Sequence, residues 1–153
     1  MISVTAQFSF EAAHRLFLYN GDCSNIHGHS YKVEVSIMST VNKEKESERD
    51  YPGIALDFKE LKSIVGRHLR EKYDHFLFLN AEDSLFLVIT EYTSRVNTFQ
   101  TNPTAEVMAE RLYREIRGLL LRNEIKADLN YVKLWETEHC YVTATSASIE
   151  AWS

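Results

Sequence analysis

The chain has 153 residues, of which 44% are hydrophobic and 25% are charged, and its formal net charge is -5 at pH 7. This length predicts a single domain over residues 1–153, and the composition is typical of a globular protein rather than a disordered chain. No apolar run approaches the roughly 20 residues that cross a bilayer, and no basic tract is available to neutralise phosphates. A membrane protein and a nucleic-acid platform are therefore disfavoured, and we expect a small-molecule partner.

The N-terminal segment from Ile2 to Ala12 alternates apolar and polar residues, which predicts a β-strand whose apolar face ends at His14. It lacks the basic start and continuous apolar stretch of a signal peptide, so a cytoplasmic location is expected. The two cysteines, Cys23 and Cys140, cannot build a disulfide framework. Cys23 is better explained as a free thiol that serves a metal or catalysis.

A turn signal at residues 20–22 leads to a second predicted strand, residues 30–38, which again alternates apolar and polar side chains. The two strands are expected to pair antiparallel. The highly charged stretch 42–53 predicts a solvated loop without chemistry of its own. Asp57 can then cap a first long helix, which runs to about Lys72 on apolar residues spaced by three and four.

Residues 81–102 are harder to interpret, and we expect a short helix capped by Ser84 followed by an extended piece. The second long helix opens at the sequence NPTAE, where Thr104 can cap it, and ends near Asn123. Two C-terminal strands joined by a turn around 137–139 complete the chain. This order, ββααββ, favours the α+β class, with a four-stranded antiparallel sheet and both long helices on one face.

Two histidines, His27 and His29, lie one residue apart at the start of the second strand, with only a glycine between them. Residues two apart on a strand face the same way, and two buried imidazoles are costly to satisfy unless a metal accepts both lone pairs. His14 can supply a third ligand, and three histidines with an open fourth position are typical of a catalytic zinc site. An ordinary core pair remains the alternative on spacing alone. His68 and His139 are interpreted as surface residues.

Several short motifs together carry a resemblance to a known family. They are FxFEAAHRL (8–16), CxxxHGHSYKV (23–33), LDFxxLK (56–62), YDH followed by LN (73–80), NPTAE (102–106) and WET (135–137). In this order they resemble the 6-pyruvoyl-tetrahydropterin synthase family, and more closely its bacterial 6-carboxytetrahydropterin synthase branch. A single HGH would be weak evidence, but the resemblance spans nearly the whole chain.

The resemblance implies a tunnelling fold (T-fold) of the ββααββ type, in agreement with the order of the predicted elements. It also implies a homo-oligomer, a trimer or a hexamer, whose sheets assemble into a barrel with active sites between subunits. His14, His27 and His29 would then bind Zn²⁺, which holds the hydroxylated side chain of dihydroneopterin triphosphate. Zinc as a Lewis acid would polarise the side-chain oxygens and make the adjacent C–H more acidic.

The same resemblance assigns roles to four further residues. Cys23 matches the family's catalytic cysteine, which acts as a base once its thiol is activated. Asp74 and His75 match an aspartate–histidine pair in which the carboxylate orients the imidazole for proton transfer on the opposite side of the substrate. Glu136 matches the glutamate that anchors the pterin ring, because a carboxylate can accept two parallel hydrogen bonds.

Other substrate contacts stay open at this stage. Thr104 and Glu106 are candidate ring contacts, although helix capping alone explains both. A triphosphate needs a local basic cluster in a chain of net charge -5. Arg15 and Lys32 lie beside the metal motifs and are the candidates for it.

The family runs three reactions, and the sequence partly discriminates among them. The folate-type branch replaces the cysteine with a glutamate, whereas Cys23 is present here. Only Ser-Asn-Ile separates Cys23 from His27, as in the carboxy-forming branch. We therefore expect a lyase that makes 6-carboxytetrahydropterin, an early step toward queuosine and other 7-deazapurines. The alternatives are 6-pyruvoyl-tetrahydropterin synthesis and a non-catalytic member that only binds zinc or a pterin.

Overall fold

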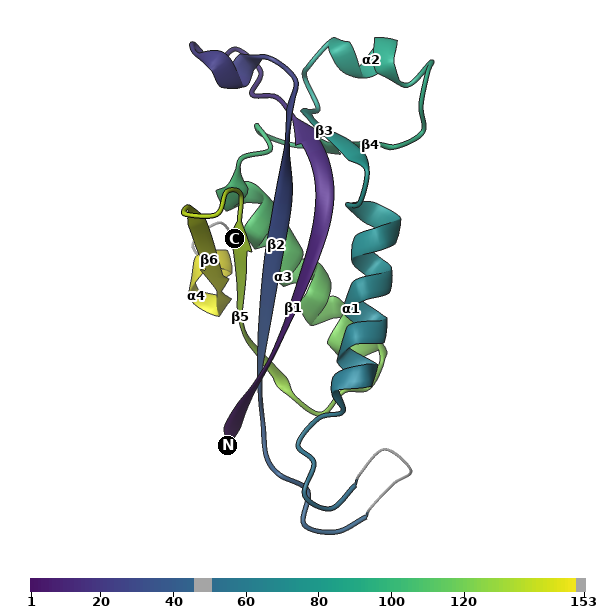
Figure 1. The fold of residues 1–153 in the computed structure, drawn as a ribbon, viewed down its shortest axis with the longest axis vertical. Helices are drawn as coiled ribbons and strands as arrows, with labels where there is room; N and C mark the ends of the chain where they lie inside the picture. Colours follow the sequence, from purple (N-terminus) through teal and green to yellow (C-terminus); the bar gives the residue numbers. More distant parts are fainter. Residues whose placement is uncertain (46–50, 151–153) are drawn as a thin grey trace.

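Six strands form one sheet in the order β4-β3-β1-β2-β5-β6 (Figure 1). The computed structural model describes residues 1–45 and 51–150. The strands are β1 (Ile2–His14), β2 (His27–Ser39), β3 (Phe76–Asn80), β4 (Val96–Phe99), β5 (Asp128–Trp135) and β6 (Tyr141–Thr145). The helical elements are η1 (Asp22–Ser24), α1 (Phe58–Lys72), α2 (Leu85–Ile89), α3 (Ala105–Arg122) and α4 (Ser146–Glu150).

The predicted four-stranded antiparallel sheet is present, but it is only part of the sheet. Strands β1, β2, β5 and β6 pair antiparallel, as expected. Strands β3 and β4 extend the sheet from β1 and run parallel to it. The prediction of four strands was wrong because the apolar run FLFLN of β3 is too short for periodicity to identify a strand. A parallel partner for β1 needs a crossover connection, which α1 provides.

The pairing of β1 with β2 brings the histidines together. The register is unbroken over the 13 residues of each strand. His14 lies directly opposite His27, and Ala12 lies opposite His29. Because opposed residues of an antiparallel pair share a face of the sheet, all three histidines project toward the face that carries the hydrophobic core.

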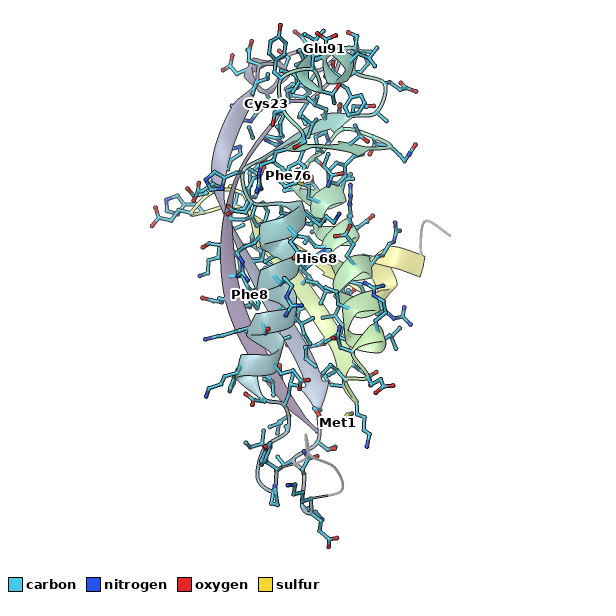
Figure 2. All side chains as sticks on the ribbon, turned by 90° about the vertical axis from the view of Figure 1, so that its right-hand side faces the viewer. Met1, Phe8, Cys23, His68, Phe76 and Glu91 are labelled. Carbon is cyan, nitrogen blue, oxygen red and sulfur yellow. The ribbon has the colours of Figure 1, made fainter. Side chains whose placement is uncertain are left out.

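Helices α1 and α3 cover that face of the sheet (Figure 2). The predicted caps of both helices are confirmed: the side chain of Asp57 accepts from the amide of Lys59, and that of Thr104 from the amide of Val107. The helix ends at Lys72 and Arg122 also lie where the sequence places them. None of the helices in residues 1–45 and 51–150 is long and apolar enough to cross a membrane.

Two local predictions were wrong. The side chain of Ser84 makes no capping bond to α2, whereas Oδ1 of Asp83 accepts from the amide of Leu85 at 3.0 Å. The last predicted strand stops at Thr145, where the chain turns into α4. The short helix and extended piece expected within residues 81–102 are confirmed as α2 and β4. Residues 46–50 of the predicted charged loop lie outside the described part of the chain.

Candidate active site

Three imidazoles meet at the end of the β1–β2 pair. The ligand nitrogens of His14, His27 and His29 all lie within 4.8 Å of one another. Nε2 of His14 is 3.0 Å from Nε2 of His27. Two nitrogens bound to a tetrahedral zinc at 2.0–2.1 Å stand about 3.3 Å apart, so the spacing has the scale of a metal site.

Backbone carbonyls determine which nitrogen of each ring is available. Nδ1 of His14 donates to the carbonyl of Pro103 at 2.7 Å, and Nδ1 of His27 donates to the carbonyl of Asn25 at 2.9 Å. A carbonyl can only accept, so these Nδ1 atoms carry the hydrogens and the Nε2 lone pairs face each other. Metal-binding histidines are commonly oriented in this way, and a cation between the rings satisfies both lone pairs.

Burial adds to the case for a metal. His14 is only 2% exposed, and Nε2 of His29 is buried without a hydrogen-bond partner among the described residues. Burial lowers the pKa of both His14 and His29 from the usual value for histidine. The neutral imidazole, which is the form that binds a metal, is thereby favoured.

Glu136 lies beside these rings, at the end of β5. Its Oε1 is 3.5 Å from Nε2 of His14 and 3.8 Å from Nε2 of His29. A molecule that hydrogen bonds to this carboxylate would therefore lie next to a metal held by the histidines. The structure thus brings the candidate ring anchor and the candidate metal ligands into one site.

Cys23 lies in η1, within the loop that joins β1 to β2. It is a free, partly buried cysteine, and its carbonyl accepts from the amide of Leu16 at 2.8 Å. No hydrogen bond within the described part of the chain ties its Sγ to the histidines. Cys23 is therefore close in sequence to His27, and its thiol is not tied to the three histidines by a hydrogen bond among the described residues.

Asp74 and His75 follow α1 directly and contact each other. Nδ1 of His75 is 3.1 Å from Oδ2 of Asp74, while Oδ1 of Asp74 accepts from the amide of Glu11 at 3.0 Å. This backbone hydrogen bond is the main reason that the pKa of Asp74 is lowered. The His75 side chain is 71% exposed, so its oriented imidazole is accessible from outside the chain.

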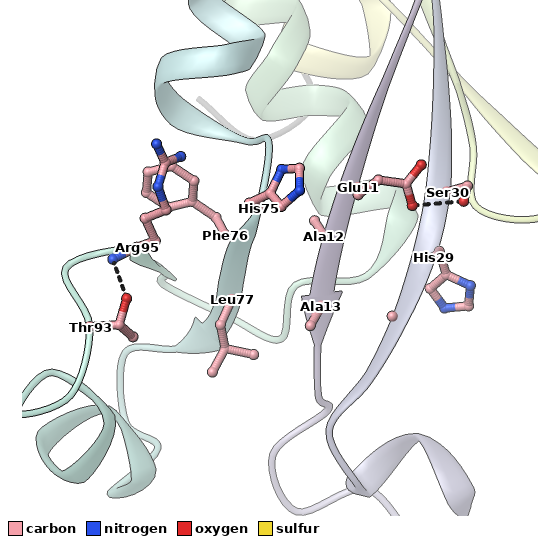
Figure 3. A pocket seen from close by; sticks show the side chains of 11 residues that line it. Glu11, Ala12, Ala13, His29, Ser30, His75, Phe76, Leu77, Thr93 and Arg95 are labelled. Carbon is pink, nitrogen blue, oxygen red and sulfur yellow. Dashed lines mark hydrogen bonds between the residues drawn. The ribbon is translucent and has the colours of Figure 1, made fainter.

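Among the described residues no hydrogen bond or ion pair joins Asp74 or His75 to the three histidines, although His29 and His75 both line one cavity. His75 lines a cavity of about 530 Å³ together with Glu11, Ser30 and Arg95, among others. Most of its lining on β1 and β2, including Glu11 and Ser30, alternates with the residues of the core face, so the cavity lies mainly on the other face of the sheet. In Figure 3, β1 and β2 run between His75 and the ring of His29.

The start of α3 contributes to the site mainly through its backbone. The carbonyl of Pro103 holds His14, whereas the hydroxyl of Thr104 accepts from the amide of Val107 at 3.5 Å and so caps the helix. Glu106 is exposed in the first turn. The cap explains the position of the Thr104 hydroxyl without any ligand. The contact of Pro103 with His14 could not be predicted from the sequence, because it is made by a backbone carbonyl.

The two basic residues near the metal motifs are already engaged. Nε of Arg15 is 2.7 Å from Oδ2 of Asp83, whose side chain is buried. Nζ of Lys32 lies 4.9 Å from the centre of the Trp135 ring. Arg15 therefore ties the loop after β1 to the segment before α2, and it is not free to hold a phosphate chain.

Tyr31 presents an unusual hydroxyl beneath the histidines. Its side chain is fully buried, its ring lies 5.5 Å from that of His29, and its hydroxyl has no hydrogen-bond partner among the described residues. An unpaired buried hydroxyl costs free energy. We therefore expect Tyr31→Phe to raise the free energy of unfolding by about 1 kcal/mol, measured by urea denaturation.

Tyr113 provides a matched control for that measurement. Its hydroxyl is buried and donates to the carbonyl of Leu129 at 2.9 Å. Tyr113→Phe should lower the free energy of unfolding by about 1 kcal/mol, because a buried hydrogen bond is lost. Equal losses in the two variants would show that the hydroxyl of Tyr31 is hydrogen bonded after all.

Comparison of the sequence with known proteins identifies a family and several relatives. The sequence matches the family described as 6-pyruvoyl tetrahydropterin synthase over residues 3–147. It is 31% identical over 144 residues to the 6-carboxy-5,6,7,8-tetrahydropterin synthase of Rickettsia felis, covering 93% of this chain and 99% of the relative. The Haemophilus influenzae protein of the same name is 28% identical, with 90% and 94% covered.

Solved structures agree with this match. The Caenorhabditis elegans 6-pyruvoyl tetrahydropterin synthase superimposes with a TM-score of 0.66 at 23% identity, covering 95% of each chain. An uncharacterized Wolinella succinogenes protein superimposes with a TM-score of 0.72 at 19% identity, covering 95% of this chain and 98% of the other. The fold and the three-histidine group define an α+β protein with a candidate metal site at one end of its sheet. The chain belongs to the 6-pyruvoyl tetrahydropterin synthase family.

Proposed function

We propose that the protein is a zinc-dependent 6-carboxy-5,6,7,8-tetrahydropterin synthase. This lyase converts 7,8-dihydroneopterin triphosphate and water to 6-carboxytetrahydropterin, acetaldehyde and triphosphate, as a step toward queuosine. The proposal rests above all on the three-histidine group, in which backbone carbonyls orient the rings of His14 and His27 and the ligand nitrogens of all three residues lie within 4.8 Å of one another. The relatives that align over nine-tenths of the chain and carry this name support the choice of reaction.

Some residues of the site bind the metal and the substrate, and others transfer protons. His14, His27 and His29 hold the metal, which when bound supplies Lewis-acid polarisation of the substrate's side-chain oxygens. Glu136 accepts hydrogen bonds from the pterin ring, and its position 3.5 Å from His14 keeps the ring beside the metal. Cys23 removes a proton from the side chain of the substrate.

Asp74 and His75 serve the other side of the reaction from a neighbouring subunit. Asp74 orients the imidazole through Oδ2, and its own orientation is fixed by the amide of Glu11. The pair faces away from the histidines of its own chain, which supports a homo-oligomer, a trimer or a hexamer assembled as a barrel. In this arrangement one subunit supplies the metal and Cys23, and the next supplies the imidazole.

Product analysis tests the proposal. We would incubate the zinc-loaded protein with dihydroneopterin triphosphate and identify the products by mass spectrometry, with Cys23→Ala as the control. 6-Carboxytetrahydropterin and acetaldehyde from the wild type alone would support the reaction and the base. A 6-pyruvoyl product would indicate pyruvoyl-tetrahydropterin synthesis, and unchanged substrate would indicate a non-catalytic member of the family.

A further inference from the structure

We propose that Glu115 and Tyr73 position the Asp74–His75 pair for its reaction. Among the described residues, neither Glu115 nor Tyr73 makes a hydrogen bond or ion pair with the side chains of Asp74 and His75. The two residues therefore act on the pair by fixing the backbone that carries it. The inference rests on the proposed function, because it assigns the pair a role in proton transfer. It adds two positioning residues that lie on the helix layer, away from the metal.

Glu115 is the centre of a cluster that joins α1 to α3, formed by His68, Tyr73, Arg111 and Glu115 and hereafter called the Glu115 cluster. Oε2 of Glu115 accepts from the hydroxyl of Tyr73 at 2.7 Å and from Nε2 of His68 at 2.8 Å. Oε1 accepts from Nε of Arg111 at 2.9 Å. His68 is therefore not the free surface residue that the sequence suggests.

The charge of Glu115 is stabilised by these donors. Burial by itself would raise the pKa of Glu115, but the hydrogen bonds from His68, Arg111 and Tyr73 outweigh it and lower the pKa to about 2. Hydrogen bonds to an ionised acceptor are stronger than those between neutral groups. The hydroxyl of Tyr73 is thus held by a permanent charge at neutral pH.

Tyr73 determines where α1 ends and the pair begins. It is the C-terminal cap of α1, and its amide and that of Asp74 both donate to the carbonyl of Leu69, at 2.9 and 2.8 Å. The chain then takes a left-handed turn at His75, where φ is 62°. A residue other than glycine adopts this conformation only when its surroundings hold it there. The amide of His75 is fixed by the carbonyl of Glu11 at 2.6 Å.

Side chains from near β4 hold the residues on either side of Tyr73. Nδ2 of Asn97 donates to the carbonyl of Lys72 at 3.4 Å, and Nη1 of Arg95 donates to the carbonyl of Asp74 at 2.9 Å. Three consecutive residues at the end of α1 are therefore each held by a separate side chain.

Arg111 links this support to the Glu115 cluster. Besides Glu115, it binds Oδ1 of Asn97 through Nη2 at 3.2 Å and the carbonyl of Thr98 through Nη1 at 2.9 Å. A continuous set of polar contacts thus surrounds His75, whose φ is positive, and it is suited to holding the Asp74–His75 pair in one conformation.

The test compares two buried tyrosines that each lose one hydroxyl. Tyr73→Phe removes the bond to Glu115 while its ring keeps its contacts with Phe10 and Phe78. Tyr113→Phe removes the bond to the carbonyl of Leu129 on β5. Both variants should lower the melting temperature, Tyr73→Phe by more than Tyr113→Phe, because only the Tyr73 hydroxyl donates to an ionised carboxylate. Only Tyr73→Phe should lower kcat, by about tenfold, with KM and zinc content unchanged.

Hydrogen exchange supplies a readout that does not depend on turnover. The amides of Asp74 and His75 should exchange faster in Tyr73→Phe than in the wild type, and Tyr113→Phe should leave them unchanged. Equal losses of kcat in the two variants, or unchanged exchange in Tyr73→Phe, would overturn the inference. If the wild type turns over no pterin triphosphate, the proposed function fails, and the exchange comparison alone decides whether Tyr73 holds the pair.

Discussion

Replacing His29 with alanine is expected to remove the bound metal and abolish turnover while leaving the fold intact. Nε2 of His29 is buried and lies 3.8 Å from Oε1 of Glu136 but has no hydrogen-bond partner among the described residues, so its loss breaks no hydrogen bond. A site that keeps only two of its three imidazoles should bind zinc at least about a hundredfold more weakly. Inductively coupled plasma mass spectrometry of the dialysed protein measures the zinc bound per chain, and the product assay measures turnover.

His139→Ala is the matched control for this variant. His139 is exposed in the turn between β5 and β6, as the sequence predicts, and it is not part of the histidine group. This control should retain one metal per chain together with full activity. Zinc should also raise the melting temperature of the wild type and of the control but not of His29→Ala, since a ligand stabilises only the state that binds it. Full zinc occupancy in His29→Ala would contradict the assigned ligand set.

Replacing His75 with alanine is expected to lower kcat about 10²- to 10⁴-fold without loss of metal, because one acid–base group is removed. The imidazole is 71% exposed and makes no hydrogen bond or ion pair with the three histidines among the described residues, so the histidine group should be undisturbed. Rapid-quench measurement of turnover together with metal analysis separates these two effects. Retention of full activity would exclude His75 from proton transfer.

Mixed oligomers of two inactive variants extend this test to the assembly. Cys23→Ala and His75→Ala chains would be unfolded together and refolded with zinc. If the active site draws Cys23 and His75 from different subunits, some mixed sites contain both wild-type residues and activity returns. Two variants that never complement each other would indicate that one chain supplies both groups.

The sequence predicts well those features that follow a regular period or a cap. The alternation in β1 places His14 on the apolar face, and the one-residue spacing of His27 and His29 places them on the matching face of β2. The caps Asp57 and Thr104 are likewise visible because an oxygen-bearing side chain precedes an apolar helix stripe. Strand β3 escapes this reasoning because a five-residue apolar run has no period that separates strand from helix.

The parts of the site that sequence reasoning misses depend on tertiary contacts. The carbonyls of Pro103 and Asn25 fix the rings of His14 and His27, and a backbone carbonyl leaves no trace in residue identity. Glu115 gains its role only because α1 and α3 pack against each other. Its hydrogen bond to Tyr73 joins two residues that are 42 positions apart in the sequence. A similar long-range contact removes Arg15 from the candidates for phosphate binding.

The unbroken register of the β1–β2 pair has a consequence for how relatives of this chain can differ in length. One residue inserted between Ala12 and His14, or between His29 and Tyr31, would turn every side chain beyond it to the other side of the sheet and disperse the ligands. Insertions between Arg15 and Ile26 would lengthen the hairpin loop and leave the register of the two strands unchanged. Among homologues, gaps should therefore collect in that loop and be absent from the strand segments beside the histidines.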